Sequence, residues 1–457
     1  MKPVKVGILG LGTVGGGAAK VLQRNAAEIA RRAGREIIIT RASASDLSKP
    51  RLCDTSNIEL TTNGFDIIND PEIDIIIETI GGAGIVKDMV LQAIENGKHV
   101  VTANKSLIAL HGNEIFAKAS EKGVIVAFEA AVAGGIPIIK AIREGLSGNQ
   151  IEWLAGIING TSNFILTEMR DKGRDFSDVL AEAQALGYAE ADPTFDVEGI
   201  DAGHKLTILA SIAFGIPLQF DKVYTEGITQ ITRTDVEYAE QLGYRIKSLG
   251  VARKTEKGIE LRVHPTLIPE RRLIANVDGV MNAVLVKGDA VGATMYYGAG
   301  AGAEPTGSAI VADVIDVVRA LACQSSTERA TNCSLPNRQL RNVLDSGDFQ
   351  TAYYLRLQTE DKPGVLADVT RILADCDISI EAILQKTLSS LPNRQLRERI
   401  QAQYGDSQSS LPNRQLREII LLTQVTQEHR LNLAITNIEQ LETVSGKVNR
   451  IRLETLG

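Results

Sequence analysis

The sequence has few cysteines, and their spacing is not that of a zinc site or a disulfide framework. Only four of its 457 residues are cysteine, and none belongs to a C-x-x-C pair or lies near a histidine at zinc-binding spacing. We therefore expect reduced thiols, as in a cytoplasmic protein. The four are Cys53, Cys323, Cys333 and Cys376.

Long apolar runs and an excess of basic residues are also absent. No apolar stretch has the length needed to span a bilayer, and the first residues run directly into a predicted strand at 4–9, which leaves no room for a signal peptide. The 49 Lys and Arg are outnumbered by 56 Asp and Glu, so the net charge is −7. Nucleic acids and membrane surfaces attract basic faces, and we expect neither as a partner.

What the chain does contain is glycine, together with ordinary proportions of apolar and charged residues. There are 41 glycines, 44% hydrophobic residues and 23% charged residues, but only 4% aromatic residues. This mixture is typical of an α/β enzyme with many tight loops. The length exceeds what one hydrophobic core usually serves, so we expect two or three domains.

Short apolar strands alternate with helices in the first 130 residues. Such alternation predicts a doubly wound, Rossmann-type parallel sheet covered by helices on both faces, in a dinucleotide-binding domain at 1–130. The predicted strands are 4–9, 36–40, 74–78, 99–102 and 124–128, and the clearest helices are 12–33 and 85–96.

A G-x-G-x-x-G pattern follows the first predicted strand and opens the first predicted helix. Gly10 permits a tight turn, Gly12 lets the backbone approach a pyrophosphate, and Gly15 allows the helix to pack closely on the strand. The helix N-terminus adds partial positive charge for phosphates. The pattern predicts a dinucleotide site, with a ligand-free glycine turn as the alternative.

The residues after the second strand leave the choice of dinucleotide open. Arg41, Lys49 and Arg51 could hold the 2′-phosphate of NADP, whereas Asp46 would favour the free 2′-hydroxyl of NAD. We therefore expect NADP or NAD.

The remainder of the chain predicts two further domains. Residues 131–325 mix helices with strands and indicate an α+β catalytic and dimerisation domain, whose helix at 307–321 packs back on the first domain. A linker at 326–349 follows. The β-α-β-β-α order in 350–457 predicts a ferredoxin-like domain, with Lys362-Pro-Gly forming a turn after its first strand.

The octapeptide SLPNRQLR occurs three times, at 334–341, 390–397 and 410–417. The unequal offsets exclude a solenoid repeat. We interpret the copies as insertions tolerated in loops, two of them near 389–417 inside the C-terminal domain. A basic ligand-binding motif is the alternative.

The strongest chemical cluster precedes and enters a predicted helix at 199–214. Asp201 and Lys205 are spaced i, i+4, so they share one face of that helix, and the apolar residues around them predict burial. A desolvated lysine can give a proton to a carbonyl oxygen, and carboxylates such as Glu190 and Asp201 suit a substrate ammonium group. A surface ion pair is the alternative, and His204 is expected to point elsewhere.

Two other segments are candidates for the same site. Lys105 follows the strand at 99–102, and ligands of open parallel sheets lie beyond the carboxyl ends of strands. It could reach a nicotinamide or a substrate oxygen. A second glycine-rich loop at 298–306 precedes a helix and could close over a cofactor.

With these segments in view, the chain resembles the homoserine dehydrogenase family over residues 4–325, and its C-terminal region resembles an ACT domain through EDKPGVLADVT at 360–370. The resemblance implies NAD(P)-dependent interconversion of aspartate 4-semialdehyde and homoserine, on the route to threonine, methionine and isoleucine. The motifs that carry it are GLGTVG at 10–15, ETIGG at 78–82, VTANK at 101–105, FEAAVAGGIPII at 128–139, GIINGTSNFIL at 156–166, LGYAEADPTFDVEGIDAGHK at 186–205 and GAGAGAEPTG at 298–307.

The resemblance also implies residue roles. Lys205 would be the proton donor and acceptor, with Asp201, Glu190 and Gly187 binding the substrate. Lys105 would lie beside the nicotinamide and the substrate oxygen. The other implied cofactor contacts are Thr13, Val14 and Gly302, in addition to Gly10, Gly12 and Gly15.

A monovalent cation and an amino-acid effector are implied in the same way. The cation, usually sodium, would bind Glu129 and the backbone carbonyls of Val132, Gly134 and Ile136. The ACT-like region would bind an effector, with threonine as the hypothesis, and the assembly would be a homodimer or homotetramer. Ser45 stands where many members carry a basic residue, which puts a strong NADP preference in doubt.

Two other functions remain open alternatives on sequence alone. A different ACT-linked dehydrogenase, such as a 2-hydroxyacid enzyme, would use a His–carboxylate pair with an Arg, and none of the five histidines has such neighbours in the sequence. A non-catalytic nucleotide or amino-acid sensor would have no need for Lys205, Asp201 and Glu190 together.

Overall fold

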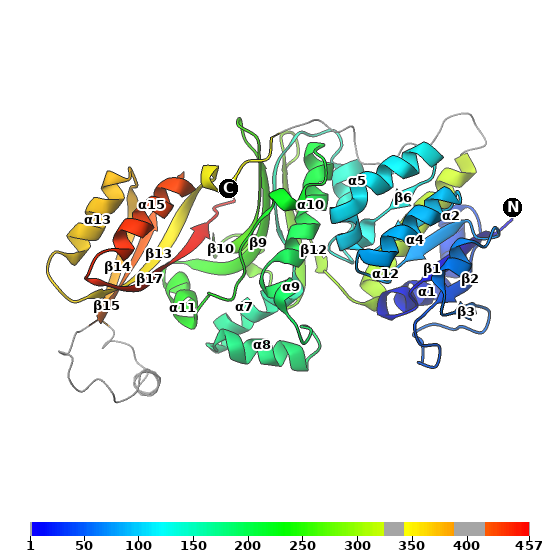
Figure 1. Ribbon diagram of the computed structural model, residues 1–457, viewed down its shortest axis with the longest axis horizontal. Helices are drawn as coiled ribbons and strands as arrows, with labels where there is room; N and C mark the ends of the chain where they lie inside the picture. The colour runs from blue at the N-terminus through cyan, green and yellow to red at the C-terminus, as the bar shows by residue number, and fades with distance from the viewer. Residues whose placement is uncertain (1, 324–341, 388–415, 457) are drawn as a thin grey trace. The chain divides into compact units, whose positions relative to one another are not determined.

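A computed structural model describes residues 2–323, 342–387 and 416–456 of the chain (Figure 1). Contacts divide the chain into two compact units. The first comprises Met1–Arg233, Ser248–His264 and Asn276–Leu344, and the second comprises Thr234–Lys247, Pro265–Ala275 and Asp345–Gly457. The first two copies of the octapeptide lie outside the described residues. Of the third copy, only Leu416 and Arg417 lie inside them.

The first unit begins with a six-stranded, all-parallel sheet in the order β3-β2-β1-β4-β5-β6. The order reverses between β1 and β4, which is where open sheets of this kind bind ligands. This confirms the predicted Rossmann-type sheet. Only the three-residue β3 had no counterpart in the sequence analysis. The strands are β1 (Val4–Leu9), β2 (Ile37–Ser43), β3 (Glu59–Thr61), β4 (Ile75–Glu78), β5 (His99–Thr102) and β6 (Val126–Ala127).

Alternate residues of these strands belong to two different cores, one on each face of the sheet. Ile75 and Ile77 pack with Val21 and Ile310, whereas Ile76 packs with the opposite core. This is why the strands are apolar throughout rather than alternating. The first face is covered by α1 (Thr13–Arg24), α2 (Ala26–Ala33) and α12 (Ala303–Cys323). The second face is covered by α3 (Gly64–Ile68), α4 (Gly84–Glu95) and α5 (Lys105–Lys122).

The rest of the first unit is built on antiparallel strands. β7 (Ile151–Ile157) pairs with β11 (Met281–Gly288) and β9 (Tyr244–Lys254), and β11 pairs with β12 (Gly292–Ala299). The long helix α10 (Ile200–Phe214) shares a core with residues of β7 and β11. Its neighbours are α7 (Gly160–Lys172), α8 (Phe176–Ala185) and the short α9 (Thr194–Val197).

Short helical turns and one further long strand complete this unit. The segment after β6 forms η1 (Glu129–Ala131), α6 (Ile138–Lys140) and η2 (Ala141–Gly145). The strand β10 (Ile259–Pro269) pairs through Arg262 and Val263 with β8 (Tyr224–Thr225). A further single turn of this unit is η3 (Phe220–Lys222), whereas η4 (Leu273–Asn276) and the end of β10 after His264 belong to the second unit, apart from Asn276.

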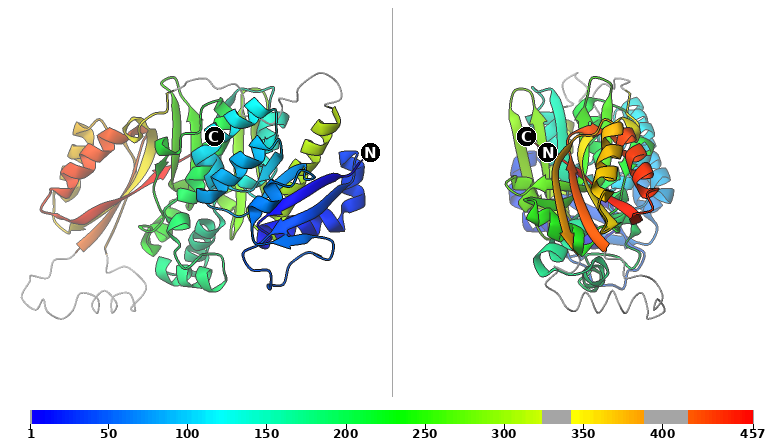
Figure 2. Two further views of the ribbon diagram at one scale, coloured as in Figure 1. Left: turned by 45° about the vertical axis from the view of Figure 1, so that its right-hand side comes forward. Right: turned by 90° about the vertical axis from the view of Figure 1, so that its left-hand side faces the viewer.

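The second unit has the β-α-β-β-α-β order of a ferredoxin-like domain, as the sequence predicted (Figure 2). Its antiparallel sheet has the strand order β17-β13-β15-β14, and a core on one face joins it to both helices. The elements are β13 (Gln350–Glu360), α13 (Val365–Asp375), β14 (Ile380–Thr387), β15 (Leu416–Thr423), α15 (Glu428–Glu439) and β17 (Val444–Leu453).

A segment from the middle of the chain completes this unit. The helix α11 (Arg233–Gln241) places Asp235 against Arg356 of β13, and Tyr238 donates to Glu418 of β15 at 2.7 Å. These side chains lie on the face of β13 opposite to Leu355 and Leu357, which belong to the helix-covered core. A buried ion pair therefore fixes a distant part of the sequence to the C-terminal sheet.

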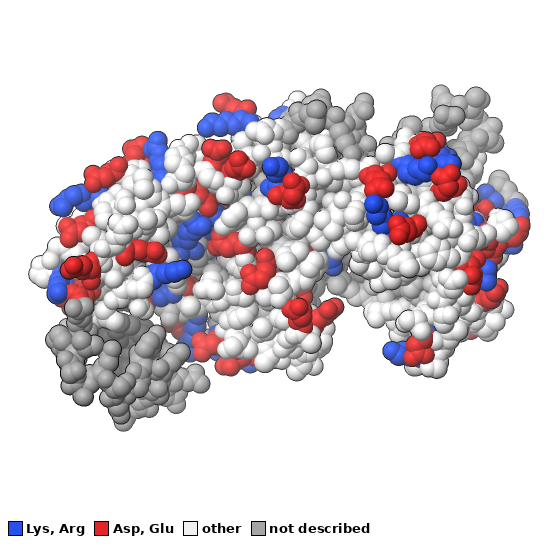
Figure 3. Space-filling model, viewed as in Figure 1, with Lys and Arg blue, Asp and Glu red and all other residues white. Residues whose placement is uncertain are grey.

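Charged side chains of both signs are interspersed on the face shown in Figure 3. Among the described residues, no helix is long and apolar enough to cross a membrane.

Candidate active site

Two lysines from different elements bind the two oxygens of one buried carboxylate. Lys205 Nζ lies 2.7 Å from Oδ2 of Asp201, and Lys105 Nζ lies 2.8 Å from Oδ1 of the same residue. The side chain of Asp201 is only 3% exposed. The structure therefore brings together Lys205 and Asp201, which the i, i+4 spacing had paired, with Lys105, which the sheet topology had placed nearby.

The first two turns of α10 and the first residue of α5 hold these groups. Lys205 and Asp201 lie one turn apart on α10, and Lys205 Nζ also donates to the carbonyl of Ile158 at 2.7 Å. Lys105 is the first residue of α5, whose N-cap Asn104 accepts the backbone N–H of Leu107 at 3.0 Å. Each ammonium is thus fixed at a helix start rather than on a free loop.

Burial and charge shift the pKa values of the two lysines in opposite directions. Burial lowers the pKa of Lys205 by more than the attraction of Asp201 raises it. Burial also acts to lower the pKa of Lys105, but the charge of Asp201 and its hydrogen bond outweigh burial and leave that pKa raised. Burial alone would raise the pKa of Asp201, but the charges of Lys205 and Lys105 hold it below its usual value. Lys205 is therefore the lysine that gives up its proton more readily.

A buried glutamate organises the loop before Lys105. The carboxylate of Glu78 accepts the backbone N–H groups of Ile80 and Gly81 at 2.8 and 3.2 Å and the hydroxyl of Thr102 at 2.6 Å. The Asn104 amide donates to the Gly82 carbonyl at 2.5 Å. The sequence analysis did not single out Glu78, although a carboxylate at the end of an otherwise apolar strand was a usable signal.

Glu190 and Gly187 lie on the exposed turn after α8. Gly187 has φ of +74°, and a side chain there would meet no atom within 4 Å. The Glu190 carboxylate makes no hydrogen bond or ion pair with the described residues, although its charge contributes to raising the pKa of Lys105. The structure places Glu190 close enough to Lys105 for their charges to interact, without joining it to Asp201.

His204 is packed between two aromatic rings. Its ring centroid lies 4.2 Å from that of Phe220 and 5.4 Å from that of Phe195, and its Nδ1 lies 3.1 Å from the Ser106 hydroxyl. Burial lowers its pKa to about 4. The imidazole is thus held neutral at ordinary pH.

The glycines of the first loop have the geometry that the motif predicted. Gly10 has φ of +94°, and a Cβ at Gly15 would collide with the Gly10 carbonyl. A Cβ at Gly12 would meet nothing within 4 Å, so the backbone there is open. Thr13 and Val14 form the first turn of α1, which has neither a side-chain cap nor an acidic residue. The N–H groups of this helix end are therefore available to an anion.

The basic residues after β2 differ in where they point. Arg41 pairs with Glu59 at 2.6 Å and with Asp70 at 3.5 Å. Arg51 donates to the carbonyl of Leu11 within the glycine loop at 2.9 Å and also to the carbonyl of Asp46. Of these two arginines, Arg51 is the one that contacts the loop.

The glycine-rich segment before α12 contacts both the first helix and the turn after η1. Gly302, with φ of +124°, precedes Ala303, whose carbonyl would collide with any Cβ at Gly17 of α1. Gly135 N donates to the Ala299 carbonyl at 2.9 Å. Gly302 therefore lies close to the helix of the phosphate loop.

The predicted cation ligands lie in a turn with unusual backbone angles. Ala133 and Gly134 both have positive φ, at 54° and 46°. The two oxygens of Glu129 accept the N–H groups of Ile139 and Lys140, each at 2.8 Å, so this carboxylate caps α6. Burial raises the pKa of Glu129 to about 7.

Backbone carbonyls rather than side chains are free in this turn. Val132 and Gly134 are buried, and among the described residues no donor is found for their carbonyl oxygens. The carbonyl of Ile136 accepts the N–H of Ile138 at 2.8 Å. The described residues contain no group of three or more His, Cys, Asp or Glu arranged to hold a metal.

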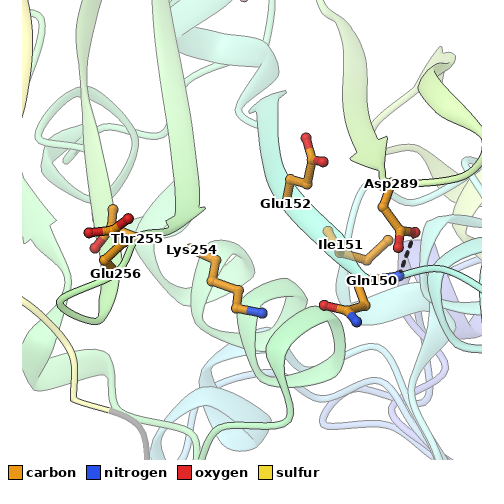
Figure 4. A pocket seen from close by; sticks show the side chains of 7 residues that line it. All are labelled: Gln150, Ile151, Glu152, Lys254, Thr255, Glu256 and Asp289. Carbon is orange, nitrogen blue, oxygen red and sulfur yellow. Dashed lines mark hydrogen bonds between the residues drawn. The ribbon is translucent and has the colours of Figure 1, made fainter.

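A separate open recess lies at the ends of β7 and β9 (Figure 4). None of the predicted site residues lines it, and we assign it no role. Its lining residues are Gln150, Ile151, Glu152, Lys254, Thr255, Glu256 and Asp289.

Models of three protein families match the chain. The model described as "Homoserine dehydrogenase, NAD binding domain" matches residues 10–129, "Homoserine dehydrogenase" matches 137–315, and "ACT domain" matches 353–389. The first two matched ranges contain the dinucleotide loop, Lys105, Glu190, Asp201 and Lys205, whereas Val132, Gly134 and Ile136 lie in the short gap between these ranges.

Proteins similar to the chain along its full length carry the same name. A homoserine dehydrogenase of Pseudomonas aeruginosa is 62% identical over 458 residues, and one of Neisseria gonorrhoeae is 52% identical over 460 residues, with 100% of each chain covered in both cases. The crystal structure of a homoserine dehydrogenase from Thiobacillus denitrificans is 61% identical, with 100% of this chain and 99% of that chain covered and a TM-score of 0.91. Identity at this level over the whole length, with a shared fold, shows that the chain belongs to the homoserine dehydrogenase family of NAD(P)-dependent oxidoreductases.

Proposed function

We propose that Lys205 is the proton donor when this enzyme reduces aspartate 4-semialdehyde to homoserine. The observation that carries the proposal is the buried Asp201 carboxylate, which binds a different lysine on each oxygen. Of the two ammonium groups, that of Lys205 is the more buried, with 12% of the side chain exposed against 34% for Lys105. Its pKa is also the one that is lowered.

The step requires one hydride and one proton. A bound NAD(P)H supplies the hydride to the aldehyde carbon, and the C=O π electrons move onto the oxygen. Lys205 gives its proton to that oxygen, forming the alcohol, and later regains a proton from water. Homoserine oxidation reverses the step, with neutral Lys205 accepting the hydroxyl proton.

Carboxylates suit the amino end of the substrate. The ammonium group would lie against Glu190, whose carboxylate has no partner among the described residues, with Gly187 in the same turn and Asp201 close by. Lys105 would contact the substrate oxygen and the nicotinamide from the cofactor side, because it starts α5 beyond the carboxyl end of β5.

The dinucleotide fits the first glycine loop. The uncapped first turn of α1 can donate N–H groups to a pyrophosphate at Gly10, Gly12 and Gly15, with Thr13 and Val14 in that turn and Gly302 beside it. Arg51 is the basic side chain that contacts this loop, and we propose it as the group that would hold a 2′-phosphate. Replacing Arg51 with Ala should raise KM for NADP more than KM for NAD.

A monovalent cation fits the turn after η1 through backbone oxygens. The buried Val132 and Gly134 have carbonyls without donors among the described residues, and carbonyl oxygens are suitable ligands for a hard cation such as sodium. Glu129 would contribute chiefly by fixing the conformation of the turn, since its carboxylate caps α6. The carbonyl of Ile136, the last of the proposed ligands, would complete the ligand set. Activity in sodium chloride should exceed activity in choline chloride at equal ionic strength.

We further propose a cytoplasmic homodimer or homotetramer in threonine, methionine and isoleucine biosynthesis, with threonine as effector. The ferredoxin-like second unit supports an effector site, because ACT domains bind small molecules. The test is activity with and without saturating threonine. Unchanged activity would contradict the effector, provided that circular dichroism shows the protein folded.

The central experiment measures NAD(P)H formation from homoserine by the wild-type protein and by Lys205→Met. We expect the variant to lose about 10²- to 10⁴-fold in kcat. The matched control is Lys98→Met, because Lys98 is also buried and donates to the backbone carbonyls of Asp70 and Ile73 at 2.5 and 2.9 Å, away from the site. A folded wild-type protein without activity would refute the function, and a fully active Lys205→Met would refute the role of Lys205.

A further inference from the structure

Asn159 takes no part in the proposed reaction, but its side chain is hydrogen-bonded to Asp201 of the Asp201–Lys205 pair. Asn159 follows β7, is only 6% exposed and is the N-cap of α7. Its Oδ1 accepts the backbone N–H of Ser162 at 2.8 Å. This bond fixes the orientation of the amide, so that its nitrogen must face away from the helix.

The amide nitrogen of Asn159 serves two carboxylates at once. Its Nδ2 donates to Oδ1 of Asp196 at 2.7 Å and to Oδ2 of Asp201 at 2.9 Å. An amide NH₂ has two hydrogens, and both are used. The Asp201 oxygen that Asn159 binds is the same oxygen that receives Lys205.

The residue before Asn159 holds the other member of the pair. The carbonyl of Ile158 accepts from Lys205 Nζ at 2.7 Å. An ammonium has three N–H donors, so Ile158 and Asp201 occupy two and leave one to be given to a substrate oxygen. Two consecutive residues therefore orient both Asp201 and Lys205.

The charged residues around Asn159 require a hydrogen-bond donor at position 159 that carries no charge itself. Asp196 and Asp201 repel one another, and this repulsion adds to burial in raising the pKa of Asp196. Lys105 and Lys205 supply the opposing charge, and Glu190 lies near Lys105. A carboxylate at residue 159 would add a fourth negative charge beside Asp196, Asp201 and Glu190, whereas an amide binds Asp196 and Asp201 without adding charge.

We propose that Asn159 is a positioning residue for proton transfer. Its amide lies between the carboxylates of Asp196 and Asp201 and holds the Asp201 carboxylate in the position in which it binds Lys205. The inference rests on the proposed function of Lys205. It concerns a side chain that would touch neither substrate nor cofactor.

The test compares Asn159→Asp with Asn159→Ser. Aspartate and serine are both good helix N-caps, so both variants retain the oxygen that caps α7 and both lose the amide donor. We expect kcat for homoserine oxidation to fall by about 10- to 150-fold in each, the range for a lost hydrogen bond to a charged group. KM for NAD(P) should stay within about twofold of the wild-type value.

The pH profile separates positioning from capping. The ascending limb of kcat/KM in the oxidation direction reports deprotonation of Lys205 under the proposed function. Asn159→Asp should move this limb to higher pH, because the added negative charge favours the protonated lysine, whereas Asn159→Ser should not move it. Equal losses in the two variants with no shift of the limb would overturn the proposal, and so would wild-type kcat in Asn159→Asp.

A matched control makes the same substitution at another helix cap. Asn63 caps α3 through Phe65 N at 3.2 Å, and its Nδ2 donates to Asp66 at 2.8 Å on the exposed surface. Asn63→Asp should leave kcat and the pH limb unchanged. The proposed function fails separately, if Lys205→Met is fully active or the folded wild type is inactive, so the two failures are distinguishable.

Discussion

Lys105 and Asp201 form an ion pair of 2.8 Å between two helices that begin in different layers of the first unit. Lys105 starts the helix that follows β5 of the parallel sheet, and Asp201 lies in the first turn of the helix that packs on the antiparallel strands. The pair joins the region that would bind the cofactor to the region that would bind the substrate.

Removal of the Lys105 charge should weaken substrate turnover without abolishing folding. Lys105→Met leaves Asp201 bound to Lys205 and Asn159 but removes one of its two cationic partners. We expect kcat/KM for homoserine to fall by about 10- to 100-fold, as for a lost hydrogen bond to a charged group. Steady-state kinetics measure this, with Lys87→Met as the control, since Lys87 pairs with Glu114 on the surface. An unchanged kcat/KM would show that the ion pair has no part in turnover.

Acid should destabilise the protein partly through His204. Its pKa is lowered to about 4 in the folded chain against an ordinary 6.5, so between these values the unfolded chain binds more protons. The stability that this group contributes is present above pH 6.5 and is lost as the pH falls towards 4. In urea unfolding at pH 7, 5.5 and 4.5, His204→Gln should lose less stability than the wild type, by a difference of the order of 1 to 3 kcal/mol.

The control for this measurement is His111→Gln, on the partly exposed side of α5 in the same unit. This variant controls for the replacement of a histidine by glutamine elsewhere in the unit. A His204→Gln variant with the same loss on acidification as the wild type would contradict the prediction.

The contact between α1 and α12 should be sensitive to a single methyl group. A Cβ at Gly17 would collide with the carbonyl of Ala303. Gly17→Ala should therefore lower the free energy of unfolding by about 1 to 3 kcal/mol and raise KM for NAD(P), because α1 carries the phosphate loop. Gly84→Ala is the control, since a Cβ there meets nothing within 4 Å. Equal melting temperatures for the two variants would refute the close contact.

Removing one partner of the buried ion pair in the second unit should lower the free energy of unfolding strongly, whereas replacing both partners by apolar residues should lower it less. Arg356 donates from Nε to Asp235 at 2.7 Å and from a terminal nitrogen at 3.1 Å, with Asp235 1% exposed. Arg356→Met removes the cation beside the buried carboxylates of Asp235 and Glu418 and should cost about 3 to 5 kcal/mol. Adding Asp235→Leu should recover part of this loss, because Glu418 keeps its hydrogen bond from Tyr238. Thermal unfolding of the single and double variants measures the coupling.

An exposed ion pair supplies the comparison for that cycle. Arg371 and Asp368 pair at 3.5 Å with side chains that are 70% and 49% exposed. Arg371→Met should change stability by less than about 1 kcal/mol. If the double variant at Arg356 and Asp235 were no more stable than Arg356→Met, the loss would come from packing rather than from the unpaired charge.

The sequence was informative where local pattern decides structure. Unbroken apolar runs such as the one at 74–78 predicted strands buried on both faces, and the i, i+4 spacing predicted that Lys205 would meet Asp201. Lys105 could be placed near them because the carboxyl ends of parallel strands share one edge. These inferences need only secondary-structure geometry.

Networks of buried polar groups were not predictable in this way. Glu78 and Asn159 act through partners that lie many residues away, such as Thr102 and Asp196, and only the folded chain brings them together. The same holds for α11, whose residues gave no sign that they pack with the C-terminal sheet. Glu129 was predicted as a cation ligand, and its use as a helix cap follows from the fold alone.

The second unit is built from three segments that are far apart in the sequence. This affects when the unit can fold during synthesis and where the chain can be truncated. Thr234–Lys247 and Pro265–Ala275 leave the ribosome long before Asp345–Gly457, so this unit cannot complete its fold until synthesis is nearly finished. A fragment that begins near residue 345 lacks Asp235, the carboxylate that binds Arg356 Nε at 2.7 Å, and retains the longer 3.4 Å contact of Arg356 with Glu418. We therefore expect that a truncation near residue 345 would remove Arg356 from Asp235 and destabilise the part of the chain that remains.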